Sequence, residues 1–237
     1  MAEPKVIFED EQLLVLDKPS GWVVNEAETT KHQDVIQVWL RNMAYPLAKN
    51  AEMRSGIVHR LDKETSGVLV VAKTKDVFEN LQSQFKERVV RKKYTALVHG
   101  KIEPKEGVVG APVGRLPWNR ERFGVLPGGR KAITNYKVLE YYSLSTDHRS
   151  PLTLVEFYPE TGRTHQIRIH AKYLGYPIVS DQFYAGRKTA RDDRTWCPRL
   201  FLHASEISFS HPKTGRNVSF KSKLTLDLSS CLKRLQE

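Results

Sequence analysis

The chain has 237 residues, 40% hydrophobic and 27% charged, which are the proportions of a folded globular protein and exclude a disordered one. Lysine and arginine number 38 against 27 acidic residues, and the resulting net charge of +11 favours a nucleic-acid partner over solubility alone. The two cysteines, Cys197 and Cys231, form no Cys-x-x-Cys pair, which argues against a zinc site and against a secreted disulfide scaffold.

The sequence shows no membrane-directed segment. No N-terminal apolar stretch has the length of a signal peptide, and no apolar run approaches the roughly 18 residues of a membrane span. We therefore expect a cytoplasmic protein without membrane association.

The first predicted element is a β-hairpin. Residues 5–10 and 12–17 are short strand-like runs around an acidic turn. Lys-Pro-Ser-Gly-Trp at residues 18–22 then forces a turn out of the second strand. Asp34 is the expected N-cap of a helix over residues 34–44. Its core-facing residues are expected to be Val35, Val38, Trp39 and Tyr45.

Residues 56–67 carry the densest set of chemically active side chains, in the order Gly-Ile-Val-His-Arg-Leu-Asp-Lys-Glu-Thr-Ser-Gly. One carboxylate, Asp62, is surrounded by a histidine, an arginine and two hydroxyls. The uninterrupted apolar run at residues 68–72 follows and is typical of a buried strand. A reactive group at the end of a core strand is rigidly presented. We predict that Asp62 lies in a loop at this strand's edge; the simpler alternative is an aspartate that only caps a turn.

Residues 76–87 predict a helix. Asp76 and Glu79 have the spacing of a capping box. The apolar residues at helical spacing are Val77, Phe78, Leu81 and Phe85. We expect a core helix with no direct role in function. The dense basic patch at residues 88–93 is either a phosphate contact or a solvated edge, and its position beside the next strand favours phosphate.

Residues 93–100 predict a strand that leads toward the reactive loop. Tyr94, Ala96 and Val98 share one face by strand alternation. Such a tyrosine is either ordinary half-buried packing or a functional group.

Residues 102–131 are rich in proline and glycine, and we predict a long RNA-binding loop. Its cationic and aromatic residues are Arg115, Trp118, Arg120, Arg122, Phe123, Arg130 and Lys131. Arginines interleaved with aromatic rings can grip a phosphate backbone and stack on splayed bases. The alternative is a hairpin without contact to a ligand.

Two alternating stretches, residues 133–142 and 152–158, indicate antiparallel strands around a polar loop. A helix is predicted over residues 164–175, with Arg168 beside its apolar face. A buried guanidinium needs a carboxylate partner, and Asp62 is the expected one.

The last part of the chain alternates between basic and apolar segments. Residues 186–199 predict a second basic loop, with Arg187, Lys188, Arg191, Arg194 and Arg199. Residues 200–209 and 217–221 predict strands, and residues 225–236 predict a terminal helix.

Five motifs together resemble the RluA family of pseudouridine synthases. The most specific is His-Arg-Leu-Asp-x-x-Thr-Ser-Gly at residues 59–67. The others are Lys-Pro-x-Gly at 18–21, Tyr-x-Ala-Leu-Val-x-Gly at 94–100, Thr-Gly-Arg-Thr-His-Gln-Ile-Arg-x-His at 161–170, and the closing motif Leu202-His-Ala with His-Pro-Lys-Thr-Gly. In one departure, Ser180 stands where the family usually has glycine before its aspartate.

The resemblance implies an α+β fold, with a long mixed, mainly antiparallel sheet, flanking helices and a central catalytic cleft. It implies one two-lobed catalytic domain over residues 1–237, with no N-terminal S4-type domain, so that the basic loops at 102–131 and 186–199 select the target. The implied partner is RNA, with ribosomal RNA slightly favoured over transfer RNA. No cofactor, no metal and no obligatory protein partner are expected, and the expected state is a monomer.

The resemblance also implies roles for individual residues. Asp62 is the nucleophile, Tyr94 packs against the target base and is a candidate acceptor of its proton, and Arg168 pairs with Asp62. Arg60 would fill the stack that a flipped uridine vacates, and Leu202 would line the uracil pocket. The remaining expected substrate or RNA contacts are His59, Thr65, Arg163, Arg115, Arg122, Lys92 and Lys93.

These residues suit the chemistry of pseudouridine formation, which breaks the N1–C1′ bond, turns the base and joins C5 to C1′ without redox or metal chemistry. A carboxylate can be the nucleophile, as it is in glycosidases. Two alternatives are a non-catalytic RNA-binding protein and a carboxylate glycosidase, which would need a second catalytic carboxylate and would leave the charge unexplained. The histidines lack metal-ligand spacing and are expected to be structural.

Overall fold

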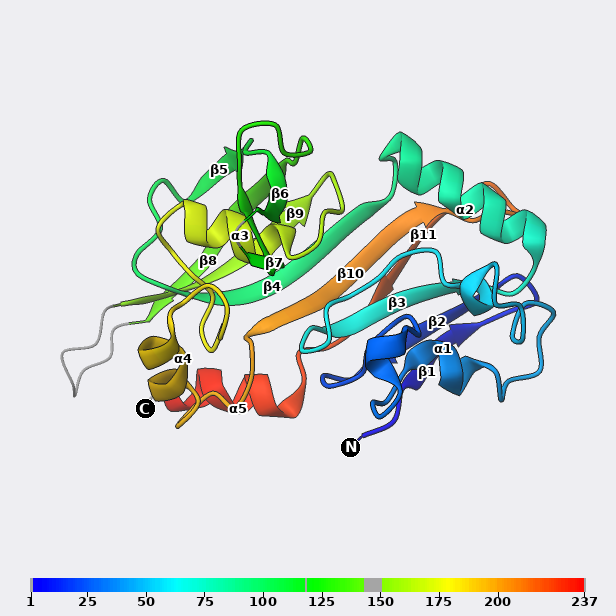
Figure 1. Cartoon of the computed structure of the whole chain (residues 1–237), viewed down its shortest axis with the longest axis horizontal. Coiled ribbons are helices and arrows are strands. Elements are labelled where there is room, and N and C mark those ends of the chain that lie inside the picture. The colour runs from blue at the N-terminus through cyan, green and yellow to red at the C-terminus, as the bar shows by residue number, and fades with distance from the viewer. Residues whose placement is uncertain (1, 118, 143–150, 237) are drawn as a thin grey trace. The chain divides into compact units, whose positions relative to one another are not determined.

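The computed structural model describes residues 2–117, 119–142 and 151–236, and most of its regular structure is antiparallel sheet (Figure 1). The chain divides into two units, residues 1–92 with 204–223 and residues 93–203 with 224–237. The expected α+β class is confirmed. The polar loop predicted after residue 142 lies outside the described residues.

The sheet of the first unit is built on its two most apolar strands. Strand β2 (Leu13–Lys18) pairs antiparallel with β1 (Lys5–Glu9) and with β3 (Ser66–Ala72). Every residue of β3 is buried, as its apolar sequence predicts. Strand β10 (Leu202–Ser210) follows β3 in the strand order, and β11 (Asn217–Lys221) pairs with β10. The predicted hairpin and the predicted last strand are confirmed.

Helix α2 (Lys75–Glu87) supplies the apolar cover of this unit. Its residues Val77, Phe78 and Leu81 pack in one cluster with side chains of β2, β3 and β10. The helix is therefore the predicted core helix. The predicted capping box is wrong, because the N-cap is Thr74 and no side chain caps the helix.

The other helices of this unit are short: η1 (Glu28–Thr30), α1 (Ile36–Leu40) and η2 (Arg54–Gly56). The helix predicted to run to residue 44 ends at Leu40, and Val38 is exposed rather than inward. Val35 is extended and forms a parallel bridge with Val23, so it is the N-cap in place of Asp34 and shifts the buried face to Ile36, Gln37 and Leu40.

The sheet of the second unit has the order β4-β9-β8-β5, and its described pairs are antiparallel. Its strands are β4 (Arg91–His99, in this unit from Lys93), β5 (Glu106–Val109), β8 (Thr134–Tyr142) and β9 (Leu152–Pro159). Helices α3 (Gln166–Tyr173) and α5 (Leu226–Arg234) pack on the same apolar core.

Both segments predicted as basic loops contain regular structure. The first holds β5 and an antiparallel hairpin of β6 (Val113–Leu116) and β7 (Asn119–Val125). Its prolines lie outside these short strands, whereas several of its glycines lie within them. The second holds helix α4 (Arg187–Asp193), which buries Ala190 and Asp193. No helix among the described residues is long and apolar enough to cross a membrane.

Candidate active site

The loop that carries Asp62 is fixed at both ends by glycines that no other residue can replace. Gly67 has a φ of +114°, and a Cβ there would lie 2.2 Å from the carbonyl oxygen of Ala204. Gly56 has a φ of +79°, and its Cβ would lie 1.9 Å from the carbonyl oxygen of Ala72. Both the backbone angle and the contact exclude a side chain. The loop is therefore held against β3 and β10 where it enters and leaves.

Asp62 lies in this loop, four residues before β3 begins at Ser66, as predicted. It is half-buried and follows the buried Leu61, and its carbonyl oxygen accepts the N–H of Thr65 at 3.1 Å. The turn is thus closed by its own backbone and leads directly into the sheet. The main chain that carries the carboxylate is therefore fixed in position.

The Lys-Pro-x-Gly turn at residues 18–21 forms hydrogen bonds to the same loop. The Lys18 ammonium is fully buried and donates to the carbonyl oxygens of Trp22 at 2.9 Å and of Lys63 at 3.2 Å. The N–H of Gly21 donates to the carbonyl of Lys63 at 2.8 Å, and the Ser20 hydroxyl donates to the carbonyl of Glu64 at 2.9 Å. The turn is therefore a scaffold for the two residues that follow Asp62.

Thr65, three residues after Asp62, has a buried hydroxyl. The residue is 1% exposed, and its Oγ1 has no hydrogen-bond partner among the described residues. Leaving a buried hydroxyl unpaired costs about 1–3 kcal/mol, and such groups are rare in folded proteins. This supports the prediction that Thr65 binds substrate.

His59 contacts a strand and a helix of its own unit, the first one. Its Nε2 accepts the N–H of Val70 at 2.9 Å, and its ring stacks on Phe85 with centroids 5.1 Å apart. Burial, together with the charge of Lys92, lowers the pKa of His59 to about 3, so the ring is neutral at physiological pH. Burial lowers the pKa of Lys92 to about 8. His59 therefore ties the loop to β3 and α2, and the contact of His59 and Lys92 with RNA stays a prediction. Arg60 is exposed.

In the second unit, Arg168 is almost wholly buried, and its described partner is a carboxylate that the sequence did not assign to it. Its Nε and Nη2 each donate to one oxygen of Asp181, both at 2.8 Å, and the two side chains are 5% and 0% exposed. The predicted pairing of Arg168 with Asp62 joins the two units and stays a prediction. Asp181 ends a short apolar segment that resembles a family motif, and this is the sequence signal for a special aspartate.

The segment before Asp181 is aligned along β4. The N–H of Val179 donates to the carbonyl of Leu97 at 2.9 Å, and Ile178 forms an antiparallel bridge with Val98. Ser180 adopts the left-handed conformation with a φ of +62°, which explains why the related motif has glycine there. Its hydroxyl donates to the carbonyl of Cys197 at 2.6 Å.

The other predicted site residues of this unit lie just before α3 and on strands β4 and β10. Arg163 donates from Nε to the carbonyl of Lys131 at 3.2 Å. Tyr94 is half-buried in β4 against the unit's core, and Leu202 is 3% exposed in that core. Lys93 lies 3.6 Å from the Glu156 carboxylate, which would compete with phosphate for its charge.

The β6–β7 hairpin presents the predicted arginines on aromatic rings. The Arg115 guanidinium carbon lies 5.0 Å from the Phe123 ring centroid, and that of Arg122 lies 5.8 Å from the Phe183 centroid. Trp118 lies outside the described residues. The hairpin therefore carries cations and rings together, the combination that RNA backbones and bases favour.

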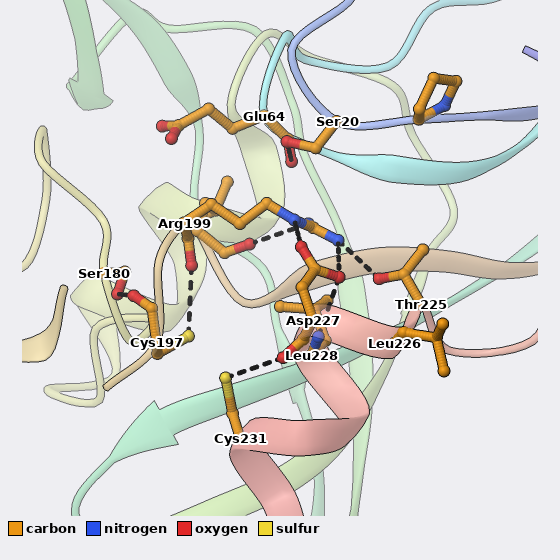
Figure 2. Close-up of polar contacts among 12 residues, drawn as sticks. Ser20, Glu64, Ser180, Cys197, Arg199, Thr225, Leu226, Asp227, Leu228 and Cys231 are labelled. Atoms are coloured by element: carbon orange, nitrogen blue, oxygen red, sulfur yellow. Dashed lines mark hydrogen bonds and ion pairs between the residues drawn. The ribbon is translucent and has the colours of Figure 1, made fainter. Parts of the chain in front are cut away.

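One predicted surface arginine, Arg199, is buried. Its Nε donates to Asp227 at 2.6 Å and its Nη2 donates to the Thr225 hydroxyl at 2.7 Å, as Figure 2 shows. The residue is 7% exposed, and its guanidinium anchors the start of α5. Arg199 is therefore structural and is not part of a basic RNA-binding surface.

No cluster of histidine, cysteine and acidic residues suited to a metal ion occurs within the described part of the chain. His170 is an example of a histidine in a structural position, because it is fully buried. Its Nδ1 lies 2.9 Å from the Thr134 hydroxyl, and its Nε2 lies 3.0 Å from the Ala111 carbonyl oxygen. Burial lowers its pKa.

Known RNA pseudouridine synthases are similar to this chain over most of its length. The profile of the RNA pseudouridylate synthase family matches residues 12–173. An uncharacterized RNA pseudouridine synthase, YlyB, of Bacillus subtilis is 38% identical over 100% of this chain and 75% of its own length. Ribosomal large subunit pseudouridine synthase D of Nitrosomonas europaea is 40% identical over 98% of this chain and 65% of its own length. The chain thus spans less than two thirds of some curated relatives.

A solved structure, human RNA pseudouridylate synthase domain containing 1, superposes with a TM-score of 0.74 at 26% identity, covering 97% of this chain and 87% of the human one. The fold and the sequence motifs therefore lead to the same conclusion. The chain belongs to the family of RNA pseudouridylate synthases, as its RluA-type motifs predict.

Proposed function

We propose that this chain isomerises specific uridines to pseudouridine in structured RNA, and that its substrate is large-subunit ribosomal RNA. Two features support this: the family to which the chain belongs, and relatives named for the ribosomal large subunit. The net charge of +11 suits a large polyanion. Transfer RNA is the second candidate. The enzyme works as a cytoplasmic monomer without a cofactor.

The observation that carries the proposal is the rigid loop around Asp62. The carboxylate stands in a backbone-closed turn between two obligatory glycines, and its neighbour Thr65 offers a buried hydroxyl without a partner in the described chain. Asp62 acts as the nucleophile. It attacks C1′ or C6, or removes the C2′ proton, while the N1–C1′ bond breaks and the base turns.

The uridine reaches this loop only after it leaves the RNA stack. Exposed Arg60 fills the vacated position. Tyr94 and Leu202 enclose the uracil, C5 bonds to C1′, and Tyr94 accepts the proton that C5 loses. Arg168 pairs with Asp62 and orients its carboxylate. The flanking RNA is bound through Arg115, Arg122, Arg163, Lys92 and Lys93.

The test is tritium release from RNA labelled at uridine C5, because the reaction breaks that C–H bond. Wild type should release tritium from large-subunit ribosomal RNA prepared from cells that lack this gene, and release less from transfer RNA. Asp62→Asn should release none while binding the RNA with similar affinity. Asp34→Ala, a half-buried aspartate in another loop of the first unit, is the control and should behave as wild type.

Release by Asp62→Asn at the wild-type rate would remove the nucleophile assignment. Tight RNA binding by wild type without release from any RNA would favour the non-catalytic alternative. Tritium release from transfer RNA alone would make transfer RNA the substrate in place of large-subunit ribosomal RNA.

A further inference from the structure

The carboxylate that holds Arg168 is itself held by the backbone. Asp181 Oδ1 accepts the N–H of Phe183 at 3.0 Å and the N–H of Tyr184 at 3.1 Å, while both oxygens bind the guanidinium. The N–H of Ala185 returns to the Asp181 carbonyl at 3.0 Å, which closes the turn. The position of the carboxylate is therefore set by the main chain and not by a flexible side chain.

The same turn supplies rings against the guanidinium. The Arg168 guanidinium carbon lies 5.1 Å from the Tyr184 ring centroid and 5.4 Å from that of Phe183. Tyr184 is 6% exposed, and its hydroxyl lies 3.0 Å from Nδ1 of His165. Two aromatic contacts and a bidentate carboxylate together fix the guanidinium plane.

This side-on contact uses one edge of the guanidinium. A carboxylate bound at Nε and Nη2 leaves Nη1 directed away from it, because the group is planar. Asp181 therefore fixes the plane of the guanidinium through the Nε–Nη2 edge alone.

Phe183 also connects this arrangement to the β6–β7 hairpin. The Phe183 ring is 39% exposed, and it lies 5.8 Å from the Arg122 guanidinium carbon as well as 5.4 Å from that of Arg168. The hairpin arginine proposed to bind RNA and the arginine proposed to act at the reacting uridine thus contact one ring.

We propose that the turn of Asp181, Phe183 and Tyr184 is a positioning cradle for Arg168, with Asp181 as the residue that fixes the guanidinium for catalysis. This inference rests on the proposed function. Asp181 does not touch the substrate; it acts through Arg168. Phe183 adds a weaker constraint and makes the position of Arg168 depend on the hairpin.

The first test is Asp181→Asn, which keeps the shape of the side chain and removes its charge. A misplaced catalytic group costs about 100-fold in rate, so kcat per folded enzyme should fall by about that factor with KM for RNA changed by less than about threefold. The matched control is Asp227→Asn, which breaks a second bidentate arginine–aspartate pair described in the same unit. It should lower the melting temperature and leave kcat per folded enzyme within about twofold.

The second test keeps the proposal falsifiable if Asp181→Asn does not fold. Phe183→Leu retains apolar volume at a partly exposed position and should lower kcat about three- to tenfold, the size of a cation–π contact. Phe183→Tyr retains the ring and should restore the wild-type rate.

A cradle with a merely structural role would lower the melting temperature of Asp181→Asn and leave its kcat per folded enzyme unchanged, and Phe183→Leu would match wild type. Those results overturn the inference even when Asp62→Asn is inactive, which would still support the proposed function. An inactive wild type would instead overturn the proposed function itself.

Discussion

Among the described residues of the second unit, two arginine–aspartate pairs have similar geometry, but one is fully buried and the other is partly exposed. In both, the guanidinium binds its carboxylate through Nε and Nη2. The Arg168–Asp181 side chains are 5% and 0% exposed and lie against two aromatic rings. The Arg199–Asp227 side chains are 9% and 39% exposed and fasten the first turn of α5 (Figure 2).

The difference in exposure distinguishes a pair that orients one side chain from a pair that anchors a helix. Solvent reaches the Asp227 carboxylate, whereas the Asp181 carboxylate is fully buried and, among the described residues, is bound by Arg168 and two backbone N–H groups. Burying an ion pair gains little stability over an apolar pair, so a fully buried pair suggests a requirement for precise orientation. The first pair suits a catalytic arginine, and the second suits a structural clamp.

The largest expected effect is that of Arg168→Ala. It strands the fully buried Asp181 carboxylate, which should lower the free energy of unfolding by about 3–5 kcal/mol, measured by urea denaturation. Isomerisation should be lost as well. The double variant Arg168→Leu with Asp181→Leu should recover much of the stability and none of the activity. A double variant with wild-type turnover would show that the pair serves folding alone.

Asp227→Asn should have a smaller effect, because its carboxylate is partly solvated. We expect the free energy of unfolding to fall by about 1–3 kcal/mol, the range for a hydrogen bond to a charged group. Turnover per folded molecule should stay unchanged. A loss as large as that of Arg168→Ala would remove the distinction between the two pairs.

Acidic pH should remove the stabilisation that the Arg199–Asp227 pair provides. Burial raises the pKa of Asp227, but hydrogen bonds from Arg199 and Thr225 outweigh it and hold the pKa below its ordinary value. The pair therefore stabilises the fold above about pH 4, where the unfolded aspartate is ionised, and this stability is lost as pH falls through the folded pKa. The melting temperatures of wild type and Asp227→Asn should converge below about pH 4. A constant difference at every pH would contradict this.

The smallest effect concerns Ser180, directly before Asp181. Ser180→Gly removes the strain of a positive φ, worth about 1–2 kcal/mol, and loses a hydroxyl hydrogen bond of about 0.5–1.5 kcal/mol, so the two terms nearly cancel. Ser180→Ala keeps the strain and loses the bond. Thermal melts should rank Ser180→Ala below both wild type and Ser180→Gly, and a Ser180→Ala variant that melts as high as Ser180→Gly would show that the turn is not strained.

The sequence predicted most strands and the loop at Asp62, because apolar runs such as residues 68–72 and the glycines at 56 and 67 are local signals. It misplaced the helix after Val35, where a bridge to Val23 overrides the expected cap. Tertiary pairing of this kind leaves no mark in helical periodicity.

The partner of Arg168 could not be predicted for the same reason. A buried guanidinium requires a carboxylate, but Asp181 is thirteen residues away, and only the alignment of its segment along β4 brings the two together. Arg199 shows the converse. Its place among exposed basic residues suggested a surface role, yet Thr225 and Asp227, which bind it, lie on a later segment.

The most direct test of the central claim, that Asp62 carries out isomerisation of uridine in RNA, is pseudouridine mapping in cells by carbodiimide labelling and primer extension. Total RNA would be compared among cells with the gene, without it, and complemented with wild type or Asp62→Ala. We predict that a site in large-subunit ribosomal RNA disappears on deletion, returns with wild type and does not return with Asp62→Ala. Restoration of that site by Asp62→Ala would contradict the account.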